Sequence, residues 1–179
     1  MALTITEALA EIKTIQARLT KKREFITRYI ARQDGQKDPL ANEGGSREAI
    51  KRERQAMTDL EARIVAIRAA IQRANASTSI TVGATTRPIA DWLVWRREVA
   101  PNTKAYVAGI IGGLASMRAD AQRKGLAVRG DEKEVTSPND IVVNVEEKAL
   151  ADEVEAMEST LGTLDGQLSL KNATTVIEV

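Results

Sequence analysis

The 179-residue chain contains neither cysteine nor histidine. Without cysteine it can form no disulfide, no thiolate metal site and no cysteine nucleophile. Without histidine it lacks the commonest general base and the commonest ligand of transition metals. The sequence also has no P-loop, no GxGxxG and no G-x-S-x-G motif. We therefore expect a protein that is not an enzyme, with no catalytic residues, no metal site and no cofactor.

Aromatic residues and long apolar runs are also scarce. Only 3% of the residues are aromatic although 43% are hydrophobic, so the core must be aliphatic, which suits narrow seams between helices. The longest weakly polar run, "AYVAGIIGGLASM" at residues 105–117, is shorter than the roughly 20 residues that span a bilayer. The first residues carry no basic region of a signal peptide. We expect no transmembrane segment and a soluble protein that is cytoplasmic when synthesised.

The formal net charge is only +1, so no global field favours nucleic acid or an anionic membrane. The two ends of the chain nevertheless differ in sign. The first helical segment is basic, with Arg18, Lys21, Lys22, Arg23, Arg28 and Arg32. The last is acidic, with Glu146, Glu147, Asp152, Glu153, Glu155 and Glu158. We expect these faces to meet each other or a neighbouring subunit, and nucleic acid to be a less favoured partner.

The first half of the chain has the pattern of two long helices. Thr4 and Glu7 have capping-box spacing, and a loop at residues 34–45 separates two apolar seams. The first seam is Ile5, Ala8, Ile12, Ile15, Leu19, Ile26 and Tyr29, with Lys22 as its polar exception, and should stop near Asp34-Gly35. The second starts at a Ser46 cap and reads Ile50, Met57, Leu60, Ile64, Ile67 and Ile71, with Glu53 as its exception. Such a pair predicts an antiparallel hairpin.

The second half follows the same plan. "STSITV", closed by Gly83, predicts a strand, and Pro88 fits the first turn of a third helix that Pro101 should kink or break. The helical pattern then resumes and stops at Gly125, with a charged loop at residues 125–139. "DIVVNV" at residues 140–145 suggests a short strand. The last helix should begin with an Asn144–Glu147 capping box, and its seam is Leu150, Val154, Met157, Leu161, Leu164 and Leu168.

The end of the chain repeats an earlier sequence. "NASTSITV" at residues 75–82 returns as "NATTVIEV" at residues 172–179, an offset of 97 that also aligns the preceding seams. We interpret this as an internal repeat of a helical hairpin followed by a strand. The predicted fold is mainly α, with two long antiparallel helical hairpins in a coiled-coil-like bundle, each followed by a short strand of a small β-ribbon. The repeats are residues 1–82 and 83–179, which we expect to form one compact or elongated unit. We expect the terminal strand to pair with Thr78–Val82 of the same or a neighbouring chain.

This order of elements resembles a small uncharacterised family of bacterial and phage helical-hairpin proteins that are sometimes named septicolysin. The likeness lies in the hairpin, the Asn-x-Ser/Thr turn, the strand, the second hairpin, the "VNVE" sequence at residues 143–146 and the Thr-rich terminal strand. The resemblance implies a long helical-hairpin bundle. It implies no active site.

Two groups of residues are candidates for contacts with a partner. "WLVWRRE" combines tryptophan with arginine, which are favoured at protein interfaces. The predicted strands carry apolar residues on edges that need pairing. The candidates are Trp92, Trp95, Arg96, Ile80, Val82, Val176, Ile177 and Val179. Separately, Gly109 and Gly113 have GxxxG spacing, which predicts close packing against another helix.

The long seams, the strands in need of partners and the lack of ligand motifs favour a structural subunit of a larger assembly. Bacteriophage connectors, collars and tails contain such chains, which would place the protein in a virion beside copies of itself and other structural proteins. One alternative is a cytoplasmic helical binding or regulatory module that uses the basic helix, with salt-sensitive retention on DNA. Another is a membrane-active, toxin-like protein that uses residues 105–117 and makes liposomes leak.

Overall fold

The computed structural model describes residues 1–130 and 137–179. It confirms a mainly α fold with small β-ribbons. The chain divides into two compact units, residues 1–78 with 168–179 and residues 79–167. The terminal strand, which the sequence repeat groups with the second hairpin, thus lies in the first unit.

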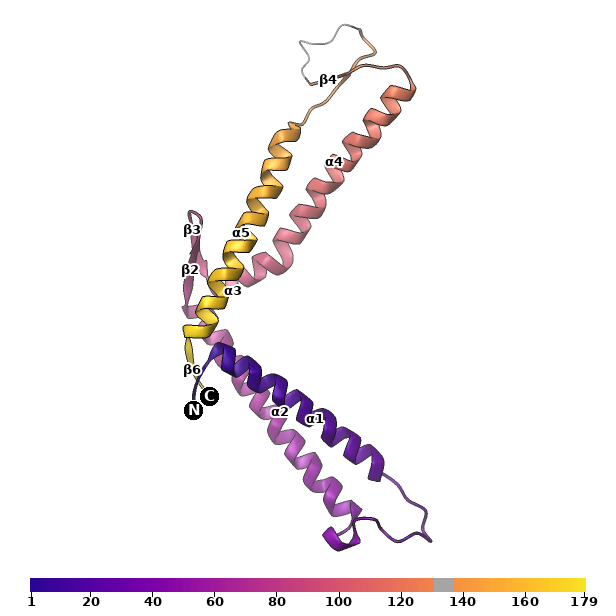
Figure 1. The fold of residues 1–179 in the computed structure, drawn as a ribbon, viewed down its shortest axis with the longest axis vertical. Helices are drawn as coiled ribbons and strands as arrows, with labels where there is room; N and C mark the ends of the chain where they lie inside the picture. Colours follow the sequence, from indigo (N-terminus) through magenta and orange to yellow (C-terminus); the bar gives the residue numbers. More distant parts are fainter. Residues whose placement is uncertain (131–136) are drawn as a thin grey trace. The chain divides into compact units, whose positions relative to one another are not determined.

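The first unit is built on an antiparallel hairpin of α1 (Ile5–Tyr29) and α2 (Ser46–Ser77), which lie side by side in Figure 1. Its seam follows the prediction in the part nearest the strands, where the apolar positions of the two helices are buried in one cluster. These are Ile5, Ala8, Ile12, Ile15 and Leu19 of α1 with Ile67, Ala70 and Ile71 of α2. Met57, Leu60 and Ile64 pack against this cluster, whereas Ile26, Tyr29 and Ile50 are half-buried outside it. α1 ends at Tyr29, short of the Asp34-Gly35 turn, and the side chain of its C-cap residue, Ile30, is exposed rather than buried in the seam.

The two helix starts of this hairpin differ from each other. At α1 the predicted capping box is present: the Glu7 N–H donates to Thr4 Oγ1 at 3.2 Å, and the Thr4 N–H donates to Glu7 Oε2 at 2.8 Å. At α2 the predicted Ser46 cap is wrong, because Gly45 is the N-cap and Ser46 is already helical. The Asp38 carboxylate does the capping from the loop, accepting from the Ser46 N–H at 2.9 Å and from Ser46 Oγ at 2.6 Å.

The second unit opens with a β-hairpin. β2 (Ser79–Val82) pairs antiparallel with β3 (Thr85–Pro88), and Gly83 adopts φ +59° in the turn between them. Pro88 is therefore the last residue of β3 and the N-cap of α3 (Ile89–Val94), not part of the first helical turn.

Pro101 neither breaks the third helix nor opens a gap in it. A π-helical turn at Trp95–Val99 joins α3 to α4 (Ala100–Arg123), and the Ala100 N–H bonds to the Trp95 carbonyl five residues back. Pro101 has no N–H to donate to the preceding turn, and the π turn adds one residue to the helix at that point. The helix therefore continues through the proline. The predicted stop at Gly125 is correct: Gly125 has φ +67°, and the Leu126 N–H donates to the Ala121 carbonyl at 2.9 Å.

The last helix, α5 (Glu147–Thr174), completes the second hairpin. We call the continuous helix made of α3, the π turn and α4 the third helix. Ion pairs join α5 to it at Arg96–Asp165, Lys104–Glu158 and Arg118–Glu147. Between α4 and α5, β4 (Val128–Arg129) pairs in parallel with β5 (Ile141–Val142), so only two residues of "DIVVNV" form a strand. The predicted charged loop 125–139 extends partly outside the described residues.

The terminal strand does not pair with Thr78–Val82 of its own chain, and that part of the prediction is wrong. β6 (Val176–Glu178) pairs antiparallel with β1 (Ala2–Thr4), with Leu3 opposite Ile177. β2 already has β3 as its partner, and β3 follows it after a two-residue turn. The local hairpin closes a much shorter loop than a pairing of β2 with β6 would, so it costs less chain entropy.

The predicted repeat of the helix-to-strand junction is confirmed at the level of single hydrogen bonds. α2 ends at Ser77 and α5 at Thr174, 97 residues later. The Thr78 N–H donates to the Ala74 carbonyl at 2.9 Å, and the Thr175 N–H donates to the Lys171 carbonyl at 2.8 Å. Ile80 and Ile177, equivalent positions in the strands that follow, are both buried.

The strand pairings reveal that each repeat also begins with a strand. Leu3 lies opposite Ile177 in one ribbon, and Arg87 lies opposite Ile80 in the other. The two registers are therefore equivalent, with β3 in the place of β1 and β2 in the place of β6. Ile5 and Ile89, the first helical residues after these strands, are both buried. Each repeat is thus strand, helical hairpin, strand, and each gives its last strand to the first strand of the other.

Candidate functional site

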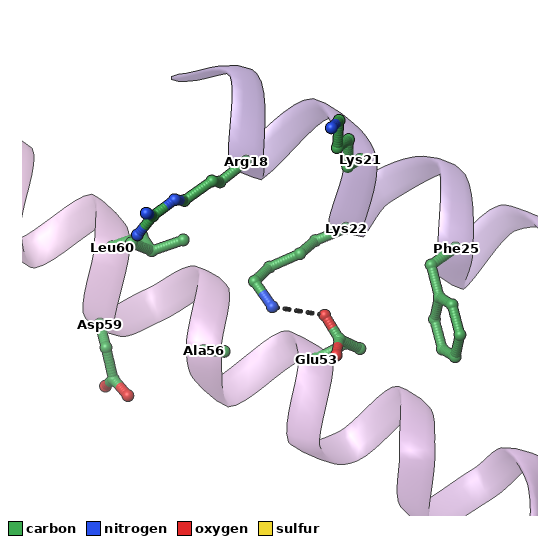
Figure 2. A pocket seen from close by; sticks show the side chains of 8 residues that line it. All are labelled: Arg18, Lys21, Lys22, Phe25, Glu53, Ala56, Asp59 and Leu60. Atoms are coloured by element: carbon green, nitrogen blue, oxygen red, sulfur yellow. Dashed lines mark hydrogen bonds and ion pairs between the residues drawn. The ribbon is translucent and has the colours of Figure 1, made fainter. Parts of the chain in front are cut away.

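A groove of about 630 Å³ lies on the first hairpin, between the second half of α1 and the first half of α2. Its lining is largely apolar, from Phe25, Ala56 and Leu60, with charged side chains around it (Figure 2). The charged residues are Arg18, Lys21 and Lys22 on α1 and Glu53 and Asp59 on α2. We call this surface the α1–α2 groove.

The groove begins where the buried seam ends. Leu19 is the last fully buried seam residue of α1, and the next seam position is Lys22. Lys22 Nζ donates to Glu53 Oε2 at 2.6 Å, shown as the dashed line in Figure 2. Both side chains are only partly covered, so the ion pair holds the helices together without filling the space between them.

Two cations on the groove have no partner within it. In the part of the chain that the structure describes, Lys21 forms no hydrogen bond and no ion pair. Arg18 extends from α1 toward Leu60 in Figure 2 and forms no ion pair within 4 Å among the described residues. Of the acids, Glu53 is neutralised by Lys22, and Asp59 accepts a hydrogen bond from Gln55 at 2.9 Å. The groove therefore combines an apolar lining with positive charge that is free to bind an anion.

Next to the groove, a second ion pair crosses the hairpin. Arg63 Nε donates to Glu11 Oε1 at 2.8 Å. That hydrogen bond lowers the pKa of Glu11, and the charge of Arg18 lowers it further. On α1 itself, Lys22 and Arg23 are held by Glu53 and Glu61, so two of the cations that a nucleic-acid surface on this helix would use are already paired.

The two units carry net charge of opposite sign. Residues 1–78 and 168–179 contain 16 lysines and arginines and 11 acidic residues, and residues 79–167 contain 10 and 14. The formal charges are therefore +5 and −4. The basic and acidic ends predicted from the sequence thus fall in different units, with the ion pairs of α1 made to α2 and those of α5 made to the third helix.

The tryptophan and arginine candidates form a cluster in the second unit. Trp92 is buried, and its indole N–H donates to the Ile80 carbonyl at 3.2 Å. Arg87 lies over the Trp92 ring at 5.3 Å, and the half-buried Trp95 packs edge-on against it at 5.6 Å. Arg96 is exposed and pairs with Asp165 at 3.1 Å. Trp92 is therefore an anchor between helix and β-hairpin, and only Trp95 and Arg96 offer surface to a partner.

The candidate residues on the strands differ in burial, because successive side chains of a strand point to opposite faces. Ile80, Val82 and Ile177 are buried inside their own units, Ile177 in the core of the first hairpin. Val179 packs partly against that core, and Val176 on the opposite face is 60% exposed. Of the five, Val176 is thus the one left open on the surface.

The exposed apolar surface of the second unit lies mainly on the third helix. Tyr106 is 70% exposed, and Val94, Val99 and Ile111 are also exposed. The predicted close packing at Gly109 and Gly113 is wrong for the described residues, since no atom lies within 4 Å of the position a Cβ would take at either. α4 is joined to α5 by ion pairs between long side chains, Lys104–Glu158 and Arg118–Glu147.

The described part of the chain holds no group of three or more acidic residues placed to bind a metal. Within residues 1–130 and 137–179, none of the helices has the length and apolarity needed to cross a membrane. The α1–α2 groove was not predicted from the sequence. The signal was present in Lys22 and Glu53, the polar residues that interrupt two otherwise apolar seams.

No protein-family model matches the chain, and no protein with a curated description matches it. A solved structure that matches is that of a functionally unknown conserved protein from Corynebacterium diphtheriae. It shares 18% sequence identity with a TM-score of 0.56, over 99% of this chain and 100% of the other. A likeness at this identity shows the fold alone, so the family resemblance drawn from the sequence stays a prediction.

Proposed function

We propose that the chain is a non-enzymatic structural subunit that assembles with copies of itself. The observation that carries this proposal is the unequal burial of the two hairpins. The first hairpin buries a continuous seam from Ile5 to Leu19. Of the second hairpin's central seam, Val107 is buried, Ile110, Leu114 and Met117 are only half-buried, and the neighbouring Tyr106 and Ile111 are exposed.

A surface of this kind favours a partner. Large apolar side chains gathered on one helix lose contact with water when a second subunit covers them, at about 25 cal/mol per Å². Open space at Gly109 and Gly113 would let a neighbouring helix come close to the α4 backbone. We infer that another copy of the chain supplies that helix, and that the resulting assembly is of the kind found as a connector, collar or tail component in bacteriophage particles.

Sedimentation velocity at micromolar concentration tests the self-assembly. The wild-type chain should sediment as an oligomer, and Tyr106→Glu should shift it towards the monomer. Val65→Glu is the matched control, because Val65 is 68% exposed on α2 and belongs to the first hairpin. A wild-type mass of one chain would overturn the proposal. Neighbouring genes for portal or tail proteins, and particles seen by negative-stain microscopy, test the placement in a virion.

A further inference from the structure

We propose that the α1–α2 groove is a docking site for the acidic segment of α5, residues 152–155, from a second copy of the chain. This inference rests on the proposed self-assembly and adds a second pair of contact surfaces to the α4 surface around Tyr106. The groove supplies an apolar lining from Phe25 and Leu60 and the cations Arg18 and Lys21. The other surface has to supply negative charge on an exposed helix.

The acidic segment of α5 has the chemistry that the groove lacks. Asp152, Glu153 and Glu155 are exposed, and none of them forms an ion pair within residues 1–130 and 137–179. The acids around them that do have partners, Glu147 and Glu158, are held by Arg118 and Lys104 of α4. The unpaired carboxylates are thus a separate set, open to an external cation.

Charge on the scale of the whole units supports the same pairing. The groove lies in the unit of charge +5, and residues 152–155 lie in the unit of charge −4. Two copies that meet through unlike units attract each other, whereas two copies that meet through like units repel. A second copy is therefore a better occupant than an unrelated acidic helix, because the same chain supplies both halves of the match.

Such an interface joins different surfaces of the two copies. In a pair of copies, one chain keeps an unused groove and the other keeps an unused acidic segment, so further copies can add in the same way. Heterologous contacts of this type close into rings or continue as filaments. Both outcomes suit a structural subunit, and the rotation between neighbouring copies decides between them.

Charge reversal tests the groove. Arg18→Glu combined with Lys21→Glu should weaken association about tenfold, since it replaces two attractive contacts with repulsive ones. Asp152→Lys combined with Glu155→Lys should have a similar effect, and all four changes in one chain should restore association. The control is Lys13→Glu with Arg28→Glu, which makes the same change of charge on exposed residues of α1 outside the groove. Circular dichroism should show unchanged helicity in every variant.

Disulfide trapping gives an independent measurement, because the natural chain has no cysteine. A Lys21→Cys protein mixed with a Glu155→Cys protein should form a mixed disulfide dimer on mild oxidation, and a Lys13→Cys protein should not. A disulfide that closes inside one chain carrying both changes, in preference to the mixed dimer, would overturn the inference. If the wild type is an oligomer and the groove variants leave its mass unchanged, the docking site is overturned but the proposed self-assembly stands. A monomeric wild type would instead remove the proposed self-assembly itself.

Discussion

Lys22 and Glu53, the polar residues that interrupt the two apolar seams of the first hairpin, form an ion pair with each other at 2.6 Å. In the second repeat, the 97-residue offset places Leu150 at the position of Glu53. Ile5 and Ile89 are equivalent, an offset of 84, and the π turn at Trp95–Val99 adds one residue to it. Val107 therefore stands at the position of Lys22, and Val107 is buried. One repeat thus has charge where the other has an apolar seam, and the α1–α2 groove opens at the charged one.

The ion pair should be replaceable by the residues of the second repeat. Lys22→Val or Glu53→Leu alone should lower the free energy of unfolding by about 1 kcal/mol, because each leaves a half-buried charge without its partner. The double variant should recover this loss, since two apolar residues continue the seam. Urea unfolding of all four proteins measures the coupling. The exposed pair Arg23–Glu61, at 3.7 Å, should show almost none.

The core of the first hairpin should be sensitive at Ile67. Ile67 is fully buried, so Ile67→Ala should lower the free energy of unfolding by about 3 kcal/mol through lost burial and a cavity. Val65→Ala, two residues away on the exposed face, should change it by less than about 0.5 kcal/mol. Urea unfolding measures both. Equal effects at the two positions would show that the register of α2 against α1 is wrong.

The terminal strand should be part of the core of the first unit. Ile177→Ala should cost about 3 kcal/mol of unfolding free energy, because Ile177 is buried among the α1–α2 seam residues. Val176→Ala should be nearly neutral, since that side chain faces solvent. Urea unfolding of both variants tests whether the strand is ordered, because a frayed end would make both changes neutral.

Capping of α2 by Asp38 should make stability depend on acid pH. Hydrogen bonds from the Ser46 side chain and from the Ser46 and Leu40 backbones lower the pKa of Asp38 from 3.8 to about 2. The carboxylate stabilises the folded state above pH 3.8, and this stabilisation is lost as the pH falls through the folded-state pKa.

Asp38→Ala should therefore lower the melting temperature at neutral pH and reduce its fall between about pH 4 and pH 2. Asp34→Ala is the control, an exposed acid of the same loop whose carboxylate caps no helix in the described chain. Thermal melts by circular dichroism across this pH range make the comparison. If the two variants lost stability equally and with the same pH dependence, Asp38 would not be the cap.

The hairpins and the repeated junction could be predicted from the sequence because their signals are local. Seam periodicity, the Thr4–Glu7 box and the octapeptide repeat each lie within a few helical turns. The Ser46 prediction failed because its carboxylate cap, Asp38, lies eight residues away across a loop. Spacing rules look only at the residue adjacent to the helix.

The partner of the terminal strand could not be predicted for a different reason. β1 has three residues, and its sequence, "ALT", does not stand out from the helix that follows. Strand pairing depends on where the helices bring their ends, which no local pattern records. The groove belongs to the same class of feature: Lys22 and Glu53 were each visible as exceptions, but their meeting across the hairpin, and the free Lys21 beside them, required the register of α1 against α2.

The pairing of β1 with β6 also sets an order of events during synthesis. Val176 follows Ser77 by 99 residues, so a ribosome that adds about 5–20 residues per second needs roughly 5–20 s between the end of α2 and the strand that covers its core. During that interval the hairpin can form, but the apolar end near Leu3 and Ile5 has no strand beside it. The first unit therefore begins to fold before the second and finishes after it. A nascent chain stalled within the second unit should expose this end to chaperones, which a released chain would not.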